Sequence, residues 1–282
     1  MYPLNVRIQQ KILLPFLKNR ISAPYISQAF FKSICDFVYE PKKFYSKKDM
    51  RGIETSKLLF CPSDHLHNFL EQYGMSLSGK VLVAGSSDVD FHSLDISNTN
   101  FRTLYLQNSF ISDNKRIFTL PIGVEDLSLA LNGLPWNLQP GKMNKQEKIL
   151  VGPFSPTHAN RQLLMSNVKS HPNLSIKSEL MSPSACANLS RNHVAVACPR
   201  GNGEDTHRIW ETLYRNSYPV VLENVWSKSL ARLGIPILLI PEWTQEALLH
   251  LLSRDKLPRL DRSSYPVLWT KYWIERFRSE IS

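Results

Sequence analysis

Glycines, arginines and carboxylates are concentrated in residues 198–226, which read CPRGNGEDTHRIWETLYRNSYPVVLENVW. The two glycines permit a sharp turn and close backbone approach to a ligand. A helix that begins near Thr206 would direct its free amides at the same place, which suits an anion. Arg200 and Arg208 add donors suited to phosphate. This combination favours a phosphate-bearing ligand.

Three side chains of this segment are spaced to share one helix face: Asp205, Arg208 and Glu211. A carboxylate on that face can accept hydrogen bonds from ribose hydroxyls, and an arginine can hold a diphosphate. Two simpler interpretations stay open, because Asp205 suits a helix N-cap and Arg208 with Glu211 suits an ordinary helix ion pair. The segment is neither G-x-G-x-x-G nor a P-loop, since G-K-[ST] is missing.

A second pair of carboxylates, Asp88 and Asp90, follows the apolar run KVLVA at 80–84. Such a run is typical of a parallel strand buried on both faces. Ligands of open parallel sheets lie beyond the carboxyl ends of the strands, so these side chains are candidates for a site. Asp88-Val89-Asp90 also leaves a divalent metal site open as the less favoured alternative.

The elements expected to position these residues follow an α/β pattern from residue 57 onward. Strands are expected at 57–61, 80–84, 102–106, 116–120, 148–152, 173–177, 193–198, 219–222 and 236–240. Helices are expected at 26–39, 64–73, 160–168, 182–191, 206–215, 227–233, 244–254 and 267–278. The strands of the first half end in polar or glycine-bearing turns, which indicates open parallel sheets.

Residues 133–147 are rich in Pro, Gly and Lys and are the predicted linker. We therefore expect an acceptor-binding Rossmann-like half over 1–140, a donor-binding Rossmann-like half over 141–262, and a C-terminal helix within 263–282. The basic run 42–51 is expected to be a solvated loop.

The composition of the 282-residue chain is that of a globular protein, with 43% hydrophobic and 21% charged residues, and excludes collagen-like, coiled-coil and disordered classes. The net charge of +10 favours phosphates, polyanions or acidic head groups. The four cysteines are far apart, so free thiols are expected. The longest apolar run, IPILLIP, is too short to cross a bilayer, and we expect a soluble, cytoplasmic protein.

Residues 198–221 resemble the signature of exostosin-like glycosyltransferases, roughly P-x-G-x-G-x-D-x-x-R-x-W-E-x-L followed by P-V. The positions in register are Pro199, Gly201, Gly203, Asp205, Arg208, Trp210, Glu211, Leu213, Pro219 and Val220. Residues 86–88, 106–108 and 120–123 are similar to the family's H-N-S-D, Q-N and L-P-I-G motifs. Phe154 with Arg161 resembles the start of its donor domain.

The resemblance implies a GT-B fold and an inverting, metal-independent transfer from a nucleotide sugar to a hydroxyl of a glycan. It implies a UDP-sugar, with UDP-xylose the weakly favoured donor, and no cofactor beyond this co-substrate. The donor-binding residues carried over are Arg161, Arg200, Gly201, Asn202, Gly203, Asp205, Arg208 and Glu211.

An inverting transfer needs a general base for the acceptor hydroxyl. Asp88 is the first choice because it lies in the segment that resembles H-N-S-D, although Gly85 and Ser86 stand where that pattern has His and Asn. The other candidates are Asp90, Glu204, Asp64, His65 and His92.

Two other functions remain open. The charge and the aromatic-basic ends of the chain fit nucleic-acid binding, although no nucleic-acid-binding motif is present and no such partner is expected. A catalytically inactive glycan-binding module would keep the fold. Residues 267–278 are expected to cross back to the first half, the alternative being a helix on a membrane surface.

Overall fold

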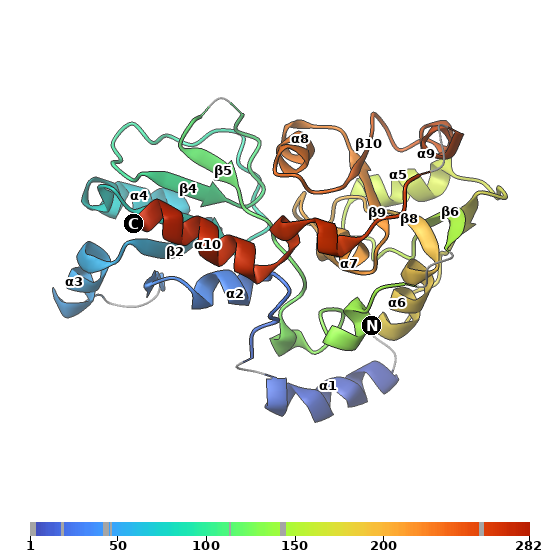
Figure 1. Cartoon of the computed structure of the whole chain (residues 1–282), viewed down its shortest axis with the longest axis horizontal. Helices are drawn as coiled ribbons and strands as arrows, with labels where there is room; N and C mark the ends of the chain where they lie inside the picture. Colours follow the sequence, from blue (N-terminus) through green and yellow to red (C-terminus); the bar gives the residue numbers. More distant parts are fainter. Residues whose placement is uncertain are drawn as a thin grey trace.

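Two parallel five-stranded sheets lie next to each other in the computed structural model (Figure 1). The structure describes residues 4–17, 20–41, 45, 47–112, 114–141, 145–253 and 257–282. The strand order is β1-β2-β3-β4-β5 in the first sheet and β10-β9-β8-β6-β7 in the second. The chain is thus an α/β protein, compatible with two Rossmann-like units.

The first sheet contains β1 (Phe37–Val38), β2 (Leu58–Pro62), β3 (Val81–Gly85), β4 (Thr103–Leu106) and β5 (Ile117–Thr119). The second contains β6 (Gln146–Val151), β7 (Leu174–Ile176), β8 (His193–Ala197), β9 (Tyr218–Leu222) and β10 (Leu238–Ile240). Each expected strand is therefore present to within a few residues. Short apolar runs form such strands because both faces of a parallel sheet are covered.

The helices described are α1 (Leu4–Leu17), α2 (Gln28–Ser33), α3 (Lys47–Thr55), α4 (Leu66–Tyr73), α5 (Ala159–Asn167), α6 (Pro183–Arg191), α7 (His207–Tyr214), α8 (Val225–Arg232), α9 (Gln245–Ser253) and α10 (Thr270–Ile281). Short 3-10 turns include η3 (Leu127–Leu129), η4 (Pro135–Leu138) and η6 (Pro266–Leu268). None of the described helices is long and apolar enough to cross a bilayer.

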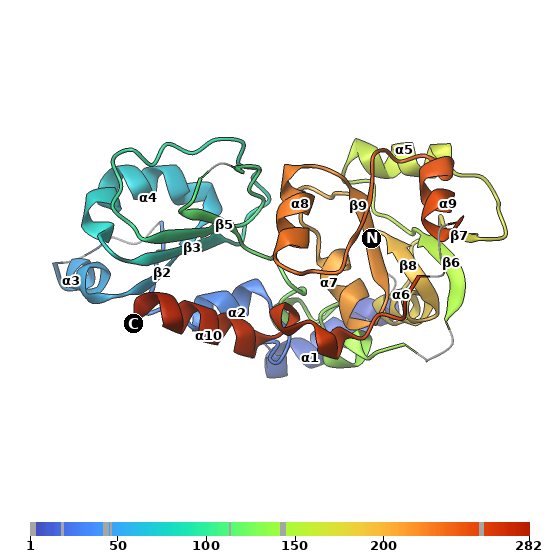
Figure 2. The same ribbon diagram turned by 45° about the horizontal axis from the view of Figure 1, so that its top comes forward.

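The alternation of side chains along β2 divides the core of the first half into two layers. Leu59 and Cys61 face the cluster that contains Phe69 of α4, whereas Leu58 and Phe60 face the cluster on the other side of the sheet. Successive residues of a strand point to opposite faces. Both faces of the first sheet are thereby covered, as Figure 2 shows.

Helix α10 lies against the first sheet, although it follows the second half in sequence (Figures 1 and 2). Trp273 and Phe277 are fully buried, and their rings contact Phe31 of α2 and Tyr105 of β4. The apolar face of the helix is therefore occupied by protein. This packing is that of a crossing helix and not of a membrane-surface helix.

The first 55 residues differ from expectation. Helix α1 was not expected, and the expected helix 26–39 is reduced to α2 followed by β1. The reason is Asp36, whose carboxylate accepts hydrogen bonds from the amides of Lys57 and Leu58 and so draws the chain into the sheet. Of the expected loop 42–51, positions 42–44 and 46 lie outside the described residues, and the chain is helical from Lys47.

The predicted linker connects the two sheets, but its described part is packed. Asn137 and Leu138 are buried in η4, and the Asn137 carbonyl accepts a 2.8 Å hydrogen bond from Nε of Arg215. Arg191 donates to the carbonyl of Gln139 at 2.9 Å. Residues 142–144 lie outside the described part. The limits 1–140, 141–262 and 263–282 stay predictions.

We expect Trp273→Ala to lower the free energy of unfolding by about 3–5 kcal/mol, because it leaves a cavity between α10 and the first sheet. Urea unfolding followed by circular dichroism measures the loss. Lys271→Ala is the matched control, because the Lys271 side chain is 86% exposed on the same helix. Equal stability of the two variants would contradict the packing role of α10.

Candidate functional site

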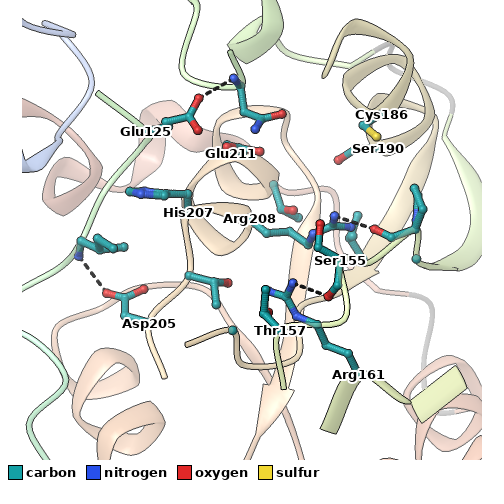
Figure 3. Close-up of a pocket in the computed structure, with 18 of the residues that line it drawn as sticks. Glu125, Ser155, Thr157, Arg161, Cys186, Ser190, Asp205, His207, Arg208 and Glu211 are labelled. Carbon is teal, nitrogen blue, oxygen red and sulfur yellow. Dashed lines mark hydrogen bonds between the residues drawn. The ribbon is translucent and has the colours of Figure 1, made fainter. Parts of the chain in front are cut away.

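A cavity of about 290 Å³ lies between the two halves of the molecule (Figure 3). The second half contributes the loops that follow β6 and β8, together with one face of α7. The first half contributes Asp88, Ile122 and Glu125. The cavity is therefore built from the carboxyl-terminal ends of strands in both sheets.

The cavity lies at the point where the strand order of the second sheet reverses. The chain runs from β6 outward to β7 and then returns to form β8 on the other side of β6. The loops after β6 and β8 must therefore diverge, because α5 leads from β6 to β7 on one side of β6, whereas α7 leads from β8 to β9 on the other side. Open parallel sheets bind their ligands in the crevice at such a point. Gly152 and Gly201 line the cavity from these two loops.

Two arginines, Arg161 of α5 and Arg208 of α7, line the cavity without a carboxylate partner among the described residues. Both are held by backbone carbonyls instead. Arg161 donates to Ser155 and Arg200 at 3.0 Å each, and Arg208 donates to Pro153 at 2.7 Å and lies over the ring of Phe154. Neutral partners thus orient the two guanidinium groups, and their positive charge stays available to a ligand.

The electrostatics of this pair support the same conclusion. Burial, and next the charge of Arg208, lower the pKa of Arg161 to about 10. The two guanidinium groups therefore repel each other in a poorly solvated place. An anion placed between them would relieve this repulsion. Figure 3 shows Arg208 between the Arg161 side of the cavity and the side that carries Glu125 and Glu211.

The N-terminus of α7 adds a third source of positive potential. Its N-cap residue, Thr206, makes no capping hydrogen bond through its side chain. Thr206 lines the cavity, and its hydroxyl is buried without a hydrogen-bond partner among the described residues. Free amides at the start of a helix attract anions. Together with Arg161 and Arg208, this helix end makes the cavity suited to a phosphate or diphosphate.

Asp205 has a different place from the one expected, because it precedes α7 and does not lie on its face. The carboxylate accepts hydrogen bonds from the Ile122 amide and from the Trp210 indole, at 2.8 Å each. The Asp205 amide donates to Asn108 at 2.9 Å. Burial raises the pKa of Asp205 to about 7. Its Oδ2 thus joins the two halves, whereas its Oδ1 bonds within the second half.

Arg200 also differs from expectation. Its guanidinium pairs with Asp90 of the first half at 2.8 Å and with Glu204 at 3.4 Å. Glu204 in turn accepts a 2.8 Å hydrogen bond from Asn224, and its burial raises its pKa. None of these three charged residues lines the cavity. They form an ion cluster that connects the halves, and two carboxylates offset the charge of Arg200.

The glycines of the motif also serve the packing of the molecule. The Cβ of a side chain at Gly203 would lie 2.6 Å from the side-chain nitrogen, Nδ2, of Asn108 in the first half. A side chain at Gly201 would lie 2.9 Å from the guanidinium of Arg161. Gly203 is thus required because the two halves are in contact at this point. Gly201 is required because the guanidinium of Arg161 lies against it.

A buried acidic pair, Glu125 and Glu211, lies on the side of the cavity away from Arg161 (Figure 3). Glu211 is 3.4 Å from the guanidinium of Arg215, and Glu125 accepts a 2.7 Å hydrogen bond from the Asn132 amide. Burial and the charge of Glu211 raise the pKa of Glu125 to about 7. Sequence reasoning missed Glu125, because nothing in its local pattern marks it.

His207, the first residue of α7, also lines the cavity. Its Nδ1 lies 2.9 Å from the Gly123 carbonyl. A carbonyl only accepts, so the neutral ring carries its proton on Nδ1 and keeps Nε2 as an acceptor. His207 is therefore a second candidate base, and its position after Asp205 in the motif was the available signal.

The eleven site residues expected from the sequence divide into two groups. Those that line the cavity are Asp88, Arg161, Gly201, Asn202, Gly203, Asp205, Arg208 and Glu211, and those that do not are Asp90, Arg200 and Glu204. Within the described part of the chain, no three His, Cys, Asp or Glu side chains are grouped so as to hold a metal ion. Metal independence stays a prediction.

Comparison with protein-family models and with curated proteins yielded no match to this chain. The resemblance to exostosin-like enzymes thus stays a prediction. A function must accordingly be argued from the chemistry of the cavity.

We expect Glu125→Gln to change the pH dependence of stability. A carboxyl whose pKa rises from its usual 4.5 to about 7 on folding takes up a proton. Its contribution is present below pH ~4.5 and is lost as the pH rises through ~7. In the variant, the free energy of unfolding should decline less steeply between pH 5 and 7, by up to about 1 kcal/mol per pH unit. The pKa of Asp205 is also raised, so part of the pH dependence should remain in the variant.

Urea unfolding at pH 5, 6, 7 and 8 measures this slope. The control is Glu246→Gln, at an exposed position of α9. A slope unchanged from that of the parent protein would show that Glu125 does not titrate in this range.

Proposed function

We propose that the protein is an inverting glycosyltransferase of GT-B architecture that uses a nucleoside-diphosphate sugar, with a UDP-sugar as the expected donor and UDP-xylose as the weaker expectation within it. The observation that carries this proposal is the pair Arg161 and Arg208, which lack carboxylate partners among the described residues and lie beside the start of α7. Two guanidinium groups and a helix N-terminus match the charge of a diphosphate. The resemblance of residues 198–221 agrees with this donor class.

In this proposal the diphosphate lies between the two arginines and receives hydrogen bonds from the first amides of α7. Thr206 offers its unpaired hydroxyl to the same group. Glu211 is the expected acceptor for ribose hydroxyls, and its Oε2 is steadied by Arg215. The glycan acceptor enters from the side of the first half, where Asp88 and Glu125 line the cavity.

The transfer breaks the bond between the anomeric carbon and the diphosphate oxygen. A base takes the proton of the acceptor hydroxyl, whose oxygen attacks the anomeric carbon on the face opposite the leaving group, so the configuration inverts. The electron pair of the broken bond goes to the diphosphate. Arg161 and Arg208 stabilise this growing negative charge, which is where enzymes gain most of their rate.

Asp88 is the proposed base. Its backbone lies against the turn of the motif, because a side chain at Gly203 would be 3.2 Å from the Asp88 Cα. Asp88 lines the same cavity as the arginines, whereas Asp90 and Glu204 are held by Arg200. His207 is the alternative, because its Nε2 is free to accept a proton.

We expect UDP to bind the protein and Arg208→Ala and Arg161→Ala to weaken that binding. Each substitution removes charge-assisted hydrogen bonds, which corresponds to a loss of affinity of about 10- to 100-fold. Isothermal titration calorimetry with UDP, GDP, CMP and TDP measures it, and each nucleotide is titrated with and without Mg²⁺. Arg278→Ala, at an exposed position of α10, is the charge-matched control.

Selective UDP binding that both cavity variants lose would support the proposal. Failure of every nucleotide to bind, together with salt-sensitive binding of oligonucleotides, would contradict it in favour of a nucleic-acid-binding protein. UDP binding without turnover of any UDP-sugar would indicate an inactive module.

We expect Asp88→Asn to slow sugar transfer by about 10²- to 10⁴-fold, the range for loss of a general base, with UDP affinity unchanged. Release of UDP from a panel of UDP-sugars and glycan acceptors measures the rate. His207→Gln is the matched comparison, since it removes the other candidate base. If His207→Gln gives the larger loss and Asp88→Asn stays active, then Asp88 is not the base.

A further inference from the structure

Helix α1 lies at the periphery of the molecule, outside both sheets (Figure 1). It packs along η3, where Gln10 donates a 3.0 Å hydrogen bond to the Leu129 carbonyl. Only the side of the helix that contains Gln9, Gln10, Leu13, Leu14 and Leu17 is partly covered. From Arg7 onward, the remaining side of the helix faces solvent.

The solvent side of α1 is apolar over half its width. Ile8, Ile12 and Phe16 are 50%, 59% and 72% exposed. Their spacing of four residues places them in one row along the helix. Pro15, also exposed, continues this apolar strip. Apolar side chains in such a row are usually buried, so their exposure indicates a surface that meets another apolar phase.

The other half of the solvent side is basic. Arg7 and Lys11 are exposed and lie one turn apart, next to the apolar row. The first 35 residues of the chain contain five Lys or Arg and no Asp or Glu. The helix thus presents an apolar strip beside a row of cations, in a segment without acidic residues.

We propose that α1 is a membrane-surface helix that lies on a bilayer containing anionic lipids. Its exposed Ile and Phe side chains enter the acyl boundary, and Arg7 and Lys11 contact acidic head groups. Helices of this kind lie in the plane of the interface with one apolar and one basic side. A second copy of the chain would bring a like charge of +10 and an acid-free segment to this surface. Charge complementarity therefore favours the lipid.

This inference is independent of the proposed sugar transfer. None of the described residues of α1 lines the cavity. A protein without transferase activity would present the same surface. Membrane binding and nucleotide binding are thus separable by experiment.

The test is co-sedimentation of the full chain with vesicles of phosphatidylcholine, alone or with about one-third phosphatidylserine. We expect binding only to the mixed vesicles, weakened as salt is raised. Ile8→Ser/Ile12→Ser/Phe16→Ser should weaken it at least about tenfold, and Arg7→Glu/Lys11→Glu should abolish it. The matched control is Leu163→Ser/Leu180→Ser, because these side chains are 49% and 57% exposed in the second half.

Circular dichroism of each variant ensures that a loss of binding reflects the surface of α1 and not unfolding. No binding of the parent protein to mixed vesicles would overturn the proposal. Equal losses in the α1 triple variant and in the control would overturn it as well. A parent protein that is a dimer by light scattering, and becomes a monomer in the triple variant without binding vesicles, would assign the surface to a second copy.

Discussion

The buried carboxylate of Asp205 is the interaction on which the arrangement of the two halves depends. It accepts one hydrogen bond from the Ile122 amide, beyond the first sheet, and one from the Trp210 indole in α7. The Asp205 amide donates to Asn108. A buried carboxylate is costly without such partners, so the halves are held where both oxygens are satisfied. The cavity, whose walls come from both sheets, exists because of this join.

The second constraint is how the positive charge of the site is divided. Arg200 is offset by two carboxylates and fastens the halves together, whereas Arg161 and Arg208 are oriented by backbone carbonyls. A carbonyl directs a guanidinium without cancelling its charge. The cavity thus keeps two cations available to an anion, whereas Arg200, which does not line it, serves the structure. Residue type alone does not distinguish these two uses of arginine.

Local pattern was a good guide to the elements that lie within each half. The run KVLVA forms most of β3, and HVAVAC forms β8. Short apolar runs of this kind suit the strands of a parallel sheet, because both faces of such a sheet are covered by other elements. The pattern failed in the first 55 residues. There the apolar spacing predicts a longer helix than α2, but the Asp36 carboxylate accepts hydrogen bonds from the amides of Lys57 and Leu58. In addition, α1 forms although Pro15 lies in its last turn. Both outcomes depend on partners distant in sequence.

Patterns of neighbouring residues were sufficient to predict the α/β class, the order of strands along the chain, and the segment that carries Arg208 and Glu211. These follow from interactions between residues close in sequence. Contacts in the folded molecule, and not local patterns, pair Asp90 with Arg200, bond Asp205 to Ile122, and bring Glu125 and His207 to the cavity. Such pairs come from separate sheets or elements. These residues come together because of the order in which the strands pack side by side in the sheets, and the spacing of residues along the chain does not specify that order.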